Sequence, residues 1–290
     1  MTSTFFRRLS QLYVLSRVYS LITRFGLNPE GILKLLKDNR SIISGSAALH
    51  ALFTGANIAP FDPKDIDFYI PHYRRDAVVE YFIEETEFDI IASYPRLAGA
   101  PYDSQYMTEV IIMKSQDAII NIIISSTKNP MDPLFSFHST CVMNAITAYG
   151  IWSAYPSLTL DFQNLINPLR SGNNTACSIL RLKGCMEKYR QRGFKDALTL
   201  SAWKEHKLHE CSTYPSCPHT ERNTRDEGTL FFPFDSLKVI KNRSRRGRRF
   251  RTICWTLGGY MCDDSSGLSA VRTIGYSLLK PASYKVLHRI

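Results

Sequence analysis

The stretch SIISGSAALHALF (41–53), followed after a proline-containing loop by KDIDFYIP (64–71), decides the fold of this chain. The first segment reads as a short apolar strand, a turn at Gly45 and Ser46, and then a helix. The second segment alternates polar and apolar residues in the manner of a strand. A strand, a turn, a helix and a further strand in this order predict an α/β domain.

The polar residues of these two segments suggest a chemistry. Asp65 and Asp67 are two positions apart on one strand, so both point to one face while Ile66 turns into the core. Close carboxylates repel unless they share a cation, and hard oxygen ligands suit Mg²⁺. Gly45 lets the backbone approach a ligand, and Ser46 with the first N–H groups of the helix suits phosphate oxygens. The alternative is a turn with a serine cap beside two solvated acids.

These residues resemble the signature of the nucleotidyltransferase (DNA polymerase beta-like) superfamily, which has an apolar residue, Gly-Ser, a helix and Asp-x-Asp on the next strand. The segments AIINIIISS, FHSTCVMN, Cys-Pro-His-Thr and Trp-x-Leu-Gly-Gly extend the likeness, which includes fungal proteins of this type, over residues 27–265. The resemblance implies a mixed sheet flanked by helices. It also implies transfer of a nucleotide from a nucleoside triphosphate to an unknown acceptor, with Gly45 and Ser46 on the triphosphate and Asp65 and Asp67 as catalytic ligands of Mg²⁺ or Mn²⁺.

The sequence departs from that family at one position. The family supplies a third carboxylate from a neighbouring strand, and the matching residue of AIINIIISS (118–126) is Asn121. A neutral amide is a poorer metal ligand and a poorer base than a carboxylate. Glu109 on the preceding strand and Asp117 in the turn are two substitutes, although Asp117 lies about 13 Å from Asn121 at roughly 3.3 Å per residue. We therefore expect nucleotide binding ahead of efficient transfer, with a catalytically inactive binding protein as the alternative to an enzyme.

The rest of the first half follows ordinary helix and strand patterns. Residues 29–39 and 75–85 have apolar residues at helical spacing. A long loop around Pro95 leads to a predicted hairpin with strands at 108–114 and 118–126. These elements complete the expected sheet and its helices.

The segment FSFHSTCVMNAITAYG (135–150) predicts a helix that is capped near Ser139 or Thr140. His138, Ser139 and Thr140 could contact a base or a ribose at the start of that helix. Helix capping is the favoured alternative.

Composition bounds the remaining choices. The 290 residues are 44% hydrophobic and 21% charged, which suits one or two domains and argues against global disorder. The net charge is +10, and residues 30–180 carry 10 basic and 16 acidic side chains, so both flanks are basic. This distribution fits a metal-binding core whose edges meet an anionic partner, and a solvated basic surface is an equal alternative.

The cysteines and the N-terminal residues bear on location and domain boundaries. Seven cysteines and no secretory signal favour an intracellular setting, cytoplasmic or nuclear, and no apolar stretch reaches the roughly 18 residues of a transmembrane segment. Residues 1–26 have Arg and aromatic residues without acids, like a mitochondrial presequence, but an ordinary helical extension is favoured. We place a nucleotidyltransferase-like domain at 27–175 and a basic, irregular region at 176–290.

Histidines and cysteines crowd one segment of the C-terminal region: His206, His209, Cys211, Cys217 and His219. Cys254 and Cys262 could complete a site with them. The spacing offers enough ligands for tetrahedral Zn²⁺ but lacks the paired C-x2-C knuckles of a strong zinc signature. Scattered thiols in a loop are the favoured interpretation, and structural zinc is the alternative.

Basic residues of the same region could reach anions. Lys183, Lys188 and Arg192 belong to a helix predicted over 181–194 and could contact phosphates, although a solvated face is favoured. The run KNRSRRGRRFR (241–251) could bind the phosphates of RNA or DNA or act as a nuclear import signal. A flexible solvated loop is the favoured alternative for this run.

Overall fold

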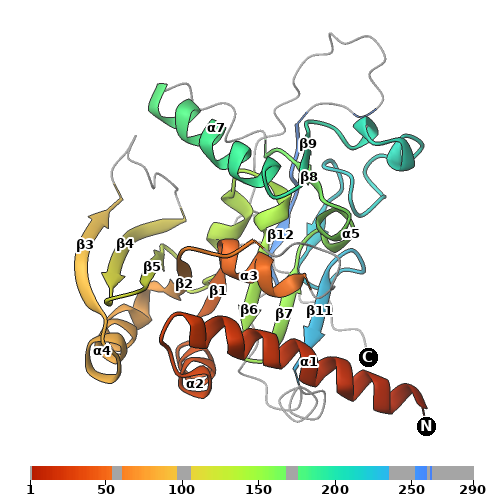
Figure 1. Ribbon diagram of the computed structural model, residues 1–290. Coiled ribbons are helices and arrows are strands. Elements are labelled where there is room, and N and C mark those ends of the chain that lie inside the picture. The colour runs from red at the N-terminus through yellow and green to blue at the C-terminus, as the bar shows by residue number, and fades with distance from the viewer. Residues whose placement is uncertain are drawn as a thin grey trace.

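Helices and strands alternate along the chain in the computed structural model, which describes residues 2–53, 61–96, 106–167, 176–234, 252–259 and 262 (Figure 1). The α-helices are α1 (Thr2–Arg24), α2 (Pro29–Asn39), α3 (Gly45–Leu52), α4 (Arg75–Glu85), α5 (Pro156–Leu160) and α7 (Ala176–Arg190). The short 3-10 helices are η1 (His72–Arg74), η2 (Asp132–Ser136), η3 (Thr140–Val142), η4 (Leu200–Ala202) and η5 (Lys204–His206).

One large sheet organises the described residues. It has eight strands in the order β11-β7-β6-β1-β2-β5-β4-β3. These strands are β1 (Ile42–Ser44), β2 (Ile66–Pro71), β3 (Asp89–Pro95), β4 (Met107–Lys114), β5 (Ile119–Ser125), β6 (Asn144–Thr147), β7 (Gly150–Ser153) and β11 (Leu230–Pro233). Only the β2–β5 pair of this sheet is parallel, so the sheet is mixed. Two small sheets pair β8 (Gln163–Leu165) with β9 (Lys195–Ala197), and β10 (Arg222–Asn223) with β12 (Cys254–Trp255). The expected mixed sheet flanked by helices is confirmed.

The two faces of the sheet carry different cores because strand residues alternate between faces. On one face, Ile43, Phe68 and Ile122 pack with buried residues of α1, α2, α3 and α4. On the other face, Tyr69 and Ile123 pack with a second core that contains tryptophans from β7 and β12. By parity Asp67 and Asn121 lie on this second face, away from the helices that cover the first.

The N-terminal helix α1 joins the first core through its second half. Val14, Val18, Leu21 and Ile22 are buried there, whereas the first half exposes large side chains such as Phe5. Figure 1 shows α1 lying beside α2 and α3. Neither the presequence interpretation nor the division at residue 175 is tested by these contacts. No helix of the described residues combines the length and apolarity needed to cross a bilayer.

Two predictions about local structure are wrong. The helix expected over 135–150 is replaced by η2, η3 and the hairpin β6–β7, in which Thr147 Oγ1 accepts the N–H groups of Tyr149 and Gly150. These strands are buried throughout, so they lack the period-2 alternation that would distinguish them from a helix. The loop expected around Pro95 contains β3, an exposed edge strand in which a proline is tolerated at the end. The helix predicted over 181–194 is found as α7, which ends at Arg190.

Candidate functional site

The Gly45–Ser46 bend stands directly against Asp67. β1 and β2 are antiparallel and pair Ser44 with Asp67, so the residue after Ser44 lies beside that carboxylate. Gly45 has a φ of 68°, in the left-handed region that favours glycine. A Cβ at this position would overlap Asp67 Oδ2, which leaves glycine as the residue that fits without a shift. Asp67 and the bend therefore meet where β1 ends, in the middle of the strand order.

Asn121 joins the two acids. β2 and β5 run parallel with Asp67 opposite Asn121. Asn121 Nδ2 donates a hydrogen bond to Asp67 Oδ1 at 2.8 Å and to Asp65 Oδ2 at 3.5 Å. Ile66, between the acids, is fully buried, as its position on the strand predicts. The polar residue in the isoleucine-rich strand is thus explained: its partners are the Asp65 and Asp67 carboxylates. We call Gly45, Ser46, Asp65, Asp67 and Asn121 the acid site.

The acid site disfavours a second negative charge. Burial raises the pKa of Asp67 to about 7, with the neighbouring Asp65 charge as the second cause. The hydrogen bond from Asn121 and the charge of Lys188 act in the opposite direction but are weaker. A carboxylate that is costly to ionise alone is one that a cation would stabilise.

Residues near the end of α7 bring basic and aromatic groups to Ser46. Ser46 Oγ lies 3.2 Å from the Tyr189 hydroxyl and accepts a hydrogen bond from Arg192 Nη1 at 3.1 Å. The Arg192 guanidinium lies over the Phe61 ring at 3.9 Å, and burial lowers the pKa of Arg192. Arg192 is therefore part of the site and does not belong to a solvated face.

Other basic and polar candidates contribute less. Lys188 is exposed, yet its charge acts on Asp67, whereas Lys183 is exposed without a described contact to the acid site. The His138 ring lies 5.4 Å from the Tyr189 ring. Thr140 accepts a hydrogen bond from the backbone of Leu165. Sequence patterns missed Tyr189 and Phe61, because neither residue type marks a site without the three-dimensional neighbourhood.

The two proposed substitutes for the third carboxylate are elsewhere. Glu109 pairs with Ile124 across the β4–β5 hairpin and accepts two hydrogen bonds from Arg75, at 2.7 and 2.8 Å. Asp117 is exposed in the hairpin turn, four positions before Asn121. Within the described residues no further Asp, Glu, His or Cys joins Asp65 and Asp67 in a group of metal-ligand geometry. The idea that Glu109 completes the acid site is therefore wrong.

A second cluster of ligand-type residues forms far from the acid site in the sequence. His209, Cys211, Cys217 and Cys262 place their ligand atoms within 4.8 Å of one another, and we call them the thiol cluster. The other candidates of this region are not members: His206 Nε2 bonds Gln163 Oε1 at 3.0 Å, and Cys254 lies on β12. His219 is also outside this group of four.

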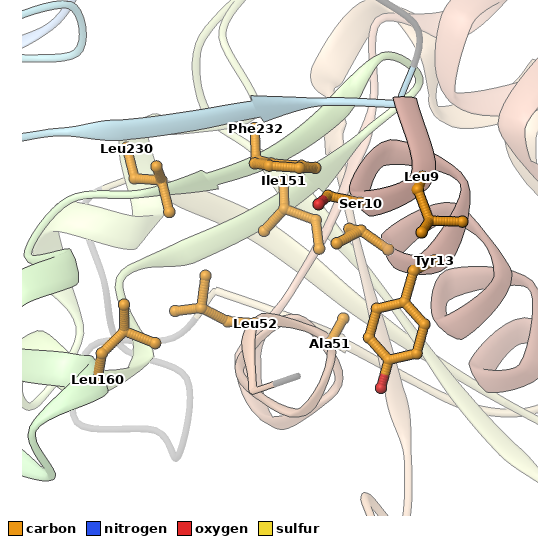
Figure 2. Close-up of a pocket in the computed structure, with 10 residues that line it drawn as sticks. Leu9, Ser10, Tyr13, Ala51, Leu52, Ile151, Leu160, Leu230 and Phe232 are labelled. Carbon is orange, nitrogen blue, oxygen red and sulfur yellow. The ribbon is translucent and has the colours of Figure 1, made fainter. Parts of the chain in front are cut away.

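An apolar cavity of about 660 Å³ lies between α1, α3, β7 and β11. Figure 2 shows Leu9 and Tyr13 of α1 on one side of it, with Leu230 of β11 and Leu160 of α5 on the opposite side. No charged side chain lines it, and none of the acid-site residues does. This cavity is unsuited to a triphosphate, so the nucleotide hypothesis does not depend on it.

Comparison with protein-family models, curated proteins and solved structures finds no match to this chain. The geometry of the acid site is therefore the basis for proposing a function. The cationic run at 241–251, on which the RNA or DNA interpretation depends, lies outside the described residues.

Proposed function

We propose that the acid site binds a nucleoside triphosphate together with a magnesium ion, in the manner of a nucleotidyltransferase fold, and that this chain binds nucleotide better than it transfers it. The observation that carries the proposal is the contact of Asp67 with the Gly45 bend and with Asn121. It puts two carboxylates beside the start of a helix, where backbone N–H groups favour phosphate.

The residues present fit Mg²⁺ on chemical grounds. Mg²⁺ is commonly held by one or two carboxylates plus substrate phosphates, so Asp65 and Asp67 suffice if the nucleotide supplies further oxygens. The pKa of Asp67 is raised because burial and the charge of Asp65 disfavour its ionised form. A bound Mg²⁺ would offset both effects. Arg192, already hydrogen-bonded to Ser46, offers a planar fork for phosphate oxygens.

The acid site lacks a carboxylate that efficient nucleotide transfer requires. A hydroxyl nucleophile has to lose its proton, and the family uses a third carboxylate for the metal ion that assists this step. At the corresponding place Asn121 directs its NH₂ group at both acids, so it orients them and supplies no negative charge. Binding without efficient transfer follows from this substitution.

The test measures binding and chemistry separately. Titration with fluorescent ATP, GTP, CTP and UTP should give Mg²⁺-dependent binding that Asp67→Ala abolishes and that Asp117→Asn, in the exposed turn, leaves unchanged. Unchanged binding by Asp67→Ala would refute the site. Pyrophosphate release with Mg²⁺ or Mn²⁺ should stay near background for the wild-type chain and rise in Asn121→Asp. Clear release by the wild-type chain, together with transfer of the labelled nucleotide to an acceptor other than water, would instead make it a transferase.

A further inference from the structure

We infer that the thiol cluster is a structural zinc site of the Cys₃His type, which fastens Cys262 onto the loop that contains His209, Cys211 and Cys217. The four ligand atoms come from two parts of the chain about fifty residues apart and lie within 4.8 Å of one another. This site is independent of the nucleotide proposal.

Two spacings within the cluster match a tetrahedron around zinc, and all four ligand atoms lie within 4.8 Å of one another. With Zn–S of about 2.3 Å and Zn–N of about 2.0–2.1 Å, tetrahedral ligands lie roughly 3.8 Å apart for two sulfurs and roughly 3.6 Å apart for sulfur and nitrogen. The Cys217 and Cys262 sulfurs are 3.9 Å apart, and Cys211 Sγ is 3.5 Å from His209 Nε2. A disulfide would need sulfurs at about 2.05 Å, so the arrangement corresponds to shared coordination.

His209 is oriented as a metal ligand. Its Nδ1 lies 2.7 Å from the carbonyl oxygen of His206. Because a carbonyl only accepts, Nδ1 is the donor of this hydrogen bond, which leaves Nε2, the atom facing Cys211, as the ring nitrogen available to a metal ion. A ligating histidine usually donates its other ring N–H to such a partner, which fixes both the tautomer and the ring.

The loop that carries Cys211 and Cys217 is held by its own backbone. Cys217 N–H donates to the carbonyl of Tyr214 at 2.9 Å, and Thr220 N–H donates to the carbonyl of Cys217 at 3.1 Å. Ser212 has a φ of 69°, a conformation that costs free energy for a residue with a Cβ and is kept where the surroundings demand it. The two cysteines are thus fixed close together by the local backbone.

Cys262 is held in place by more than its thiol. Its carbonyl oxygen accepts a hydrogen bond from Ser201 Oγ at 2.7 Å, and Gly258 N–H donates to the carbonyl of Pro218 at 2.7 Å. Cys217 is fully buried and Cys262 is 6% exposed, in the core that contains Trp255. Four protein ligands with no open position define a structural site, not a catalytic one.

The experiment is metal analysis of the full-length chain, purified without chelator and passed over a desalting column. Elemental analysis should give about one zinc per chain, and Cys217→Ala and Cys262→Ala should lose it. Cys254→Ala, in the same segment but outside the thiol cluster, should keep it. Zinc below a tenth of an equivalent with all thiols reduced, or a Cys217–Cys262 disulfide in the peptide map, would overturn the inference. Equal zinc loss from Cys254→Ala would do the same.

Should a cysteine variant fail to fold, cobalt decides the question on the wild-type chain. Replacement of zinc by Co²⁺ should give the intense visible bands of a tetrahedral ion and the near-ultraviolet absorption of cobalt–thiolate bonds. Added Zn²⁺ should then abolish both features stoichiometrically. The weak visible spectrum of a six-coordinate cobalt ion, without thiolate absorption, would contradict a Cys₃His site.

Discussion

As we propose them, the acid site and the thiol cluster would hold a cation in two different ways. The acid site is built from neighbouring strands in register and offers two hard oxygen ligands, so the ion it suits keeps positions for phosphates. The thiol cluster combines residues distant in the sequence and offers three sulfur ligands and one imidazole nitrogen, enough to close the coordination of zinc. A set of protein ligands that leaves coordination positions open suits binding of a substrate, whereas a set that fills the coordination of the ion suits stabilisation of the fold.

The largest effect should come from the thiol cluster. Cys217→Ala, or removal of zinc with a strong chelator, should lower the stability by on the order of 4 kcal/mol, because binding energy of a structural metal is folding energy. For a chain of this size that corresponds to a fall of about 10 °C in the melting temperature. Differential scanning calorimetry measures it, with Cys185→Ala on α7 as the control. An unchanged melting temperature would remove the contrast between the two sites.

The second-largest effect tests how closely Gly45 packs against Asp67 when no ligand is bound. Gly45 and Gly26 both have a φ near 70°, but a Cβ at Gly26 meets nothing within 4 Å, whereas at Gly45 it overlaps Asp67. Gly26→Ala should therefore cost about 1 kcal/mol for the left-handed backbone alone. Gly45→Ala should cost about 3 kcal/mol, because steric overlap adds to it. Urea unfolding compares the two variants, and equal costs would show that the close approach to Asp67 is relaxed in solution.

The pH dependence of stability should separate the sites further. The folded-state pKa of Asp67 is about 7, above its unfolded value of 3.8, so the folded state binds the extra proton between these values. Its stabilising contribution is complete below the unfolded pKa and is lost as the pH rises through about 7. Between pH 5 and 7 the loss should be about 2 kcal/mol, since one pH unit within the window is worth about 1.4 kcal/mol.

Asp67→Asn is the variant for this measurement, because the amide imitates the protonated acid. Thermal unfolding in magnesium-free buffer without chelator keeps zinc in place. The variant should flatten the curve above pH 5, and Mg²⁺ should stabilise only the wild-type chain. A wild-type curve as flat as that of Asp67→Asn would mean that Asp67 ionises without cost.

Local patterns predicted the position of the acids beside the Gly45 bend for a physical reason. Asp67 lies on β2 and Asp65 directly precedes this strand, so the two-residue period of a strand accounts for both acids meeting Asn121. The bend at Gly45 follows from the residue itself. The placement of Asn121 beside Asp67 was expected from the family resemblance and not from local patterns, because it depends on a parallel register between strands separated by α4, β3 and β4. Register is a property of tertiary contacts.

Residues far apart in the chain account for the rest. Arg192 reaches Ser46 across 146 positions, and Cys262 reaches Cys217 across 45. Local sequence patterns do not reveal contacts between residues so far apart. The basic residues of the helix were therefore interpreted as a solvated face, and the cysteines of the loop as scattered thiols. The hairpin β6–β7 was missed because its strands are buried on both faces and lack alternation.

The smallest effect belongs to Glu109, and it tests whether the acid site has only two acids. Glu109 accepts hydrogen bonds from Arg75 and from Ser93 Oγ at 2.8 Å, and its hydrogen bonds with Arg75 are the main cause that lowers its pKa. The stability that comes from a lowered pKa is present above the unfolded-state pKa and is lost as the pH falls through the folded-state pKa. This pH dependence is opposite to that of Asp67. Because the pair is partly exposed, Glu109→Gln should cost at most about 1 kcal/mol.

The same variant should leave Mg²⁺-dependent nucleotide binding unchanged. Glu109 is opposite Ile124, three residues along β5 from Asn121, which corresponds to about 10 Å at 3.3 Å per residue. A carboxylate at that distance and already bound to Arg75 has no direct path to an ion held by Asp65 and Asp67. A tenfold loss of nucleotide affinity in Glu109→Gln would show that the ion recruits it after all, and the acid site would then have the three carboxylates of an active transferase. If Glu109→Gln leaves the nucleotide affinity unchanged and Asn121→Asp gains pyrophosphate release, the third carboxylate that transfer requires belongs at residue 121.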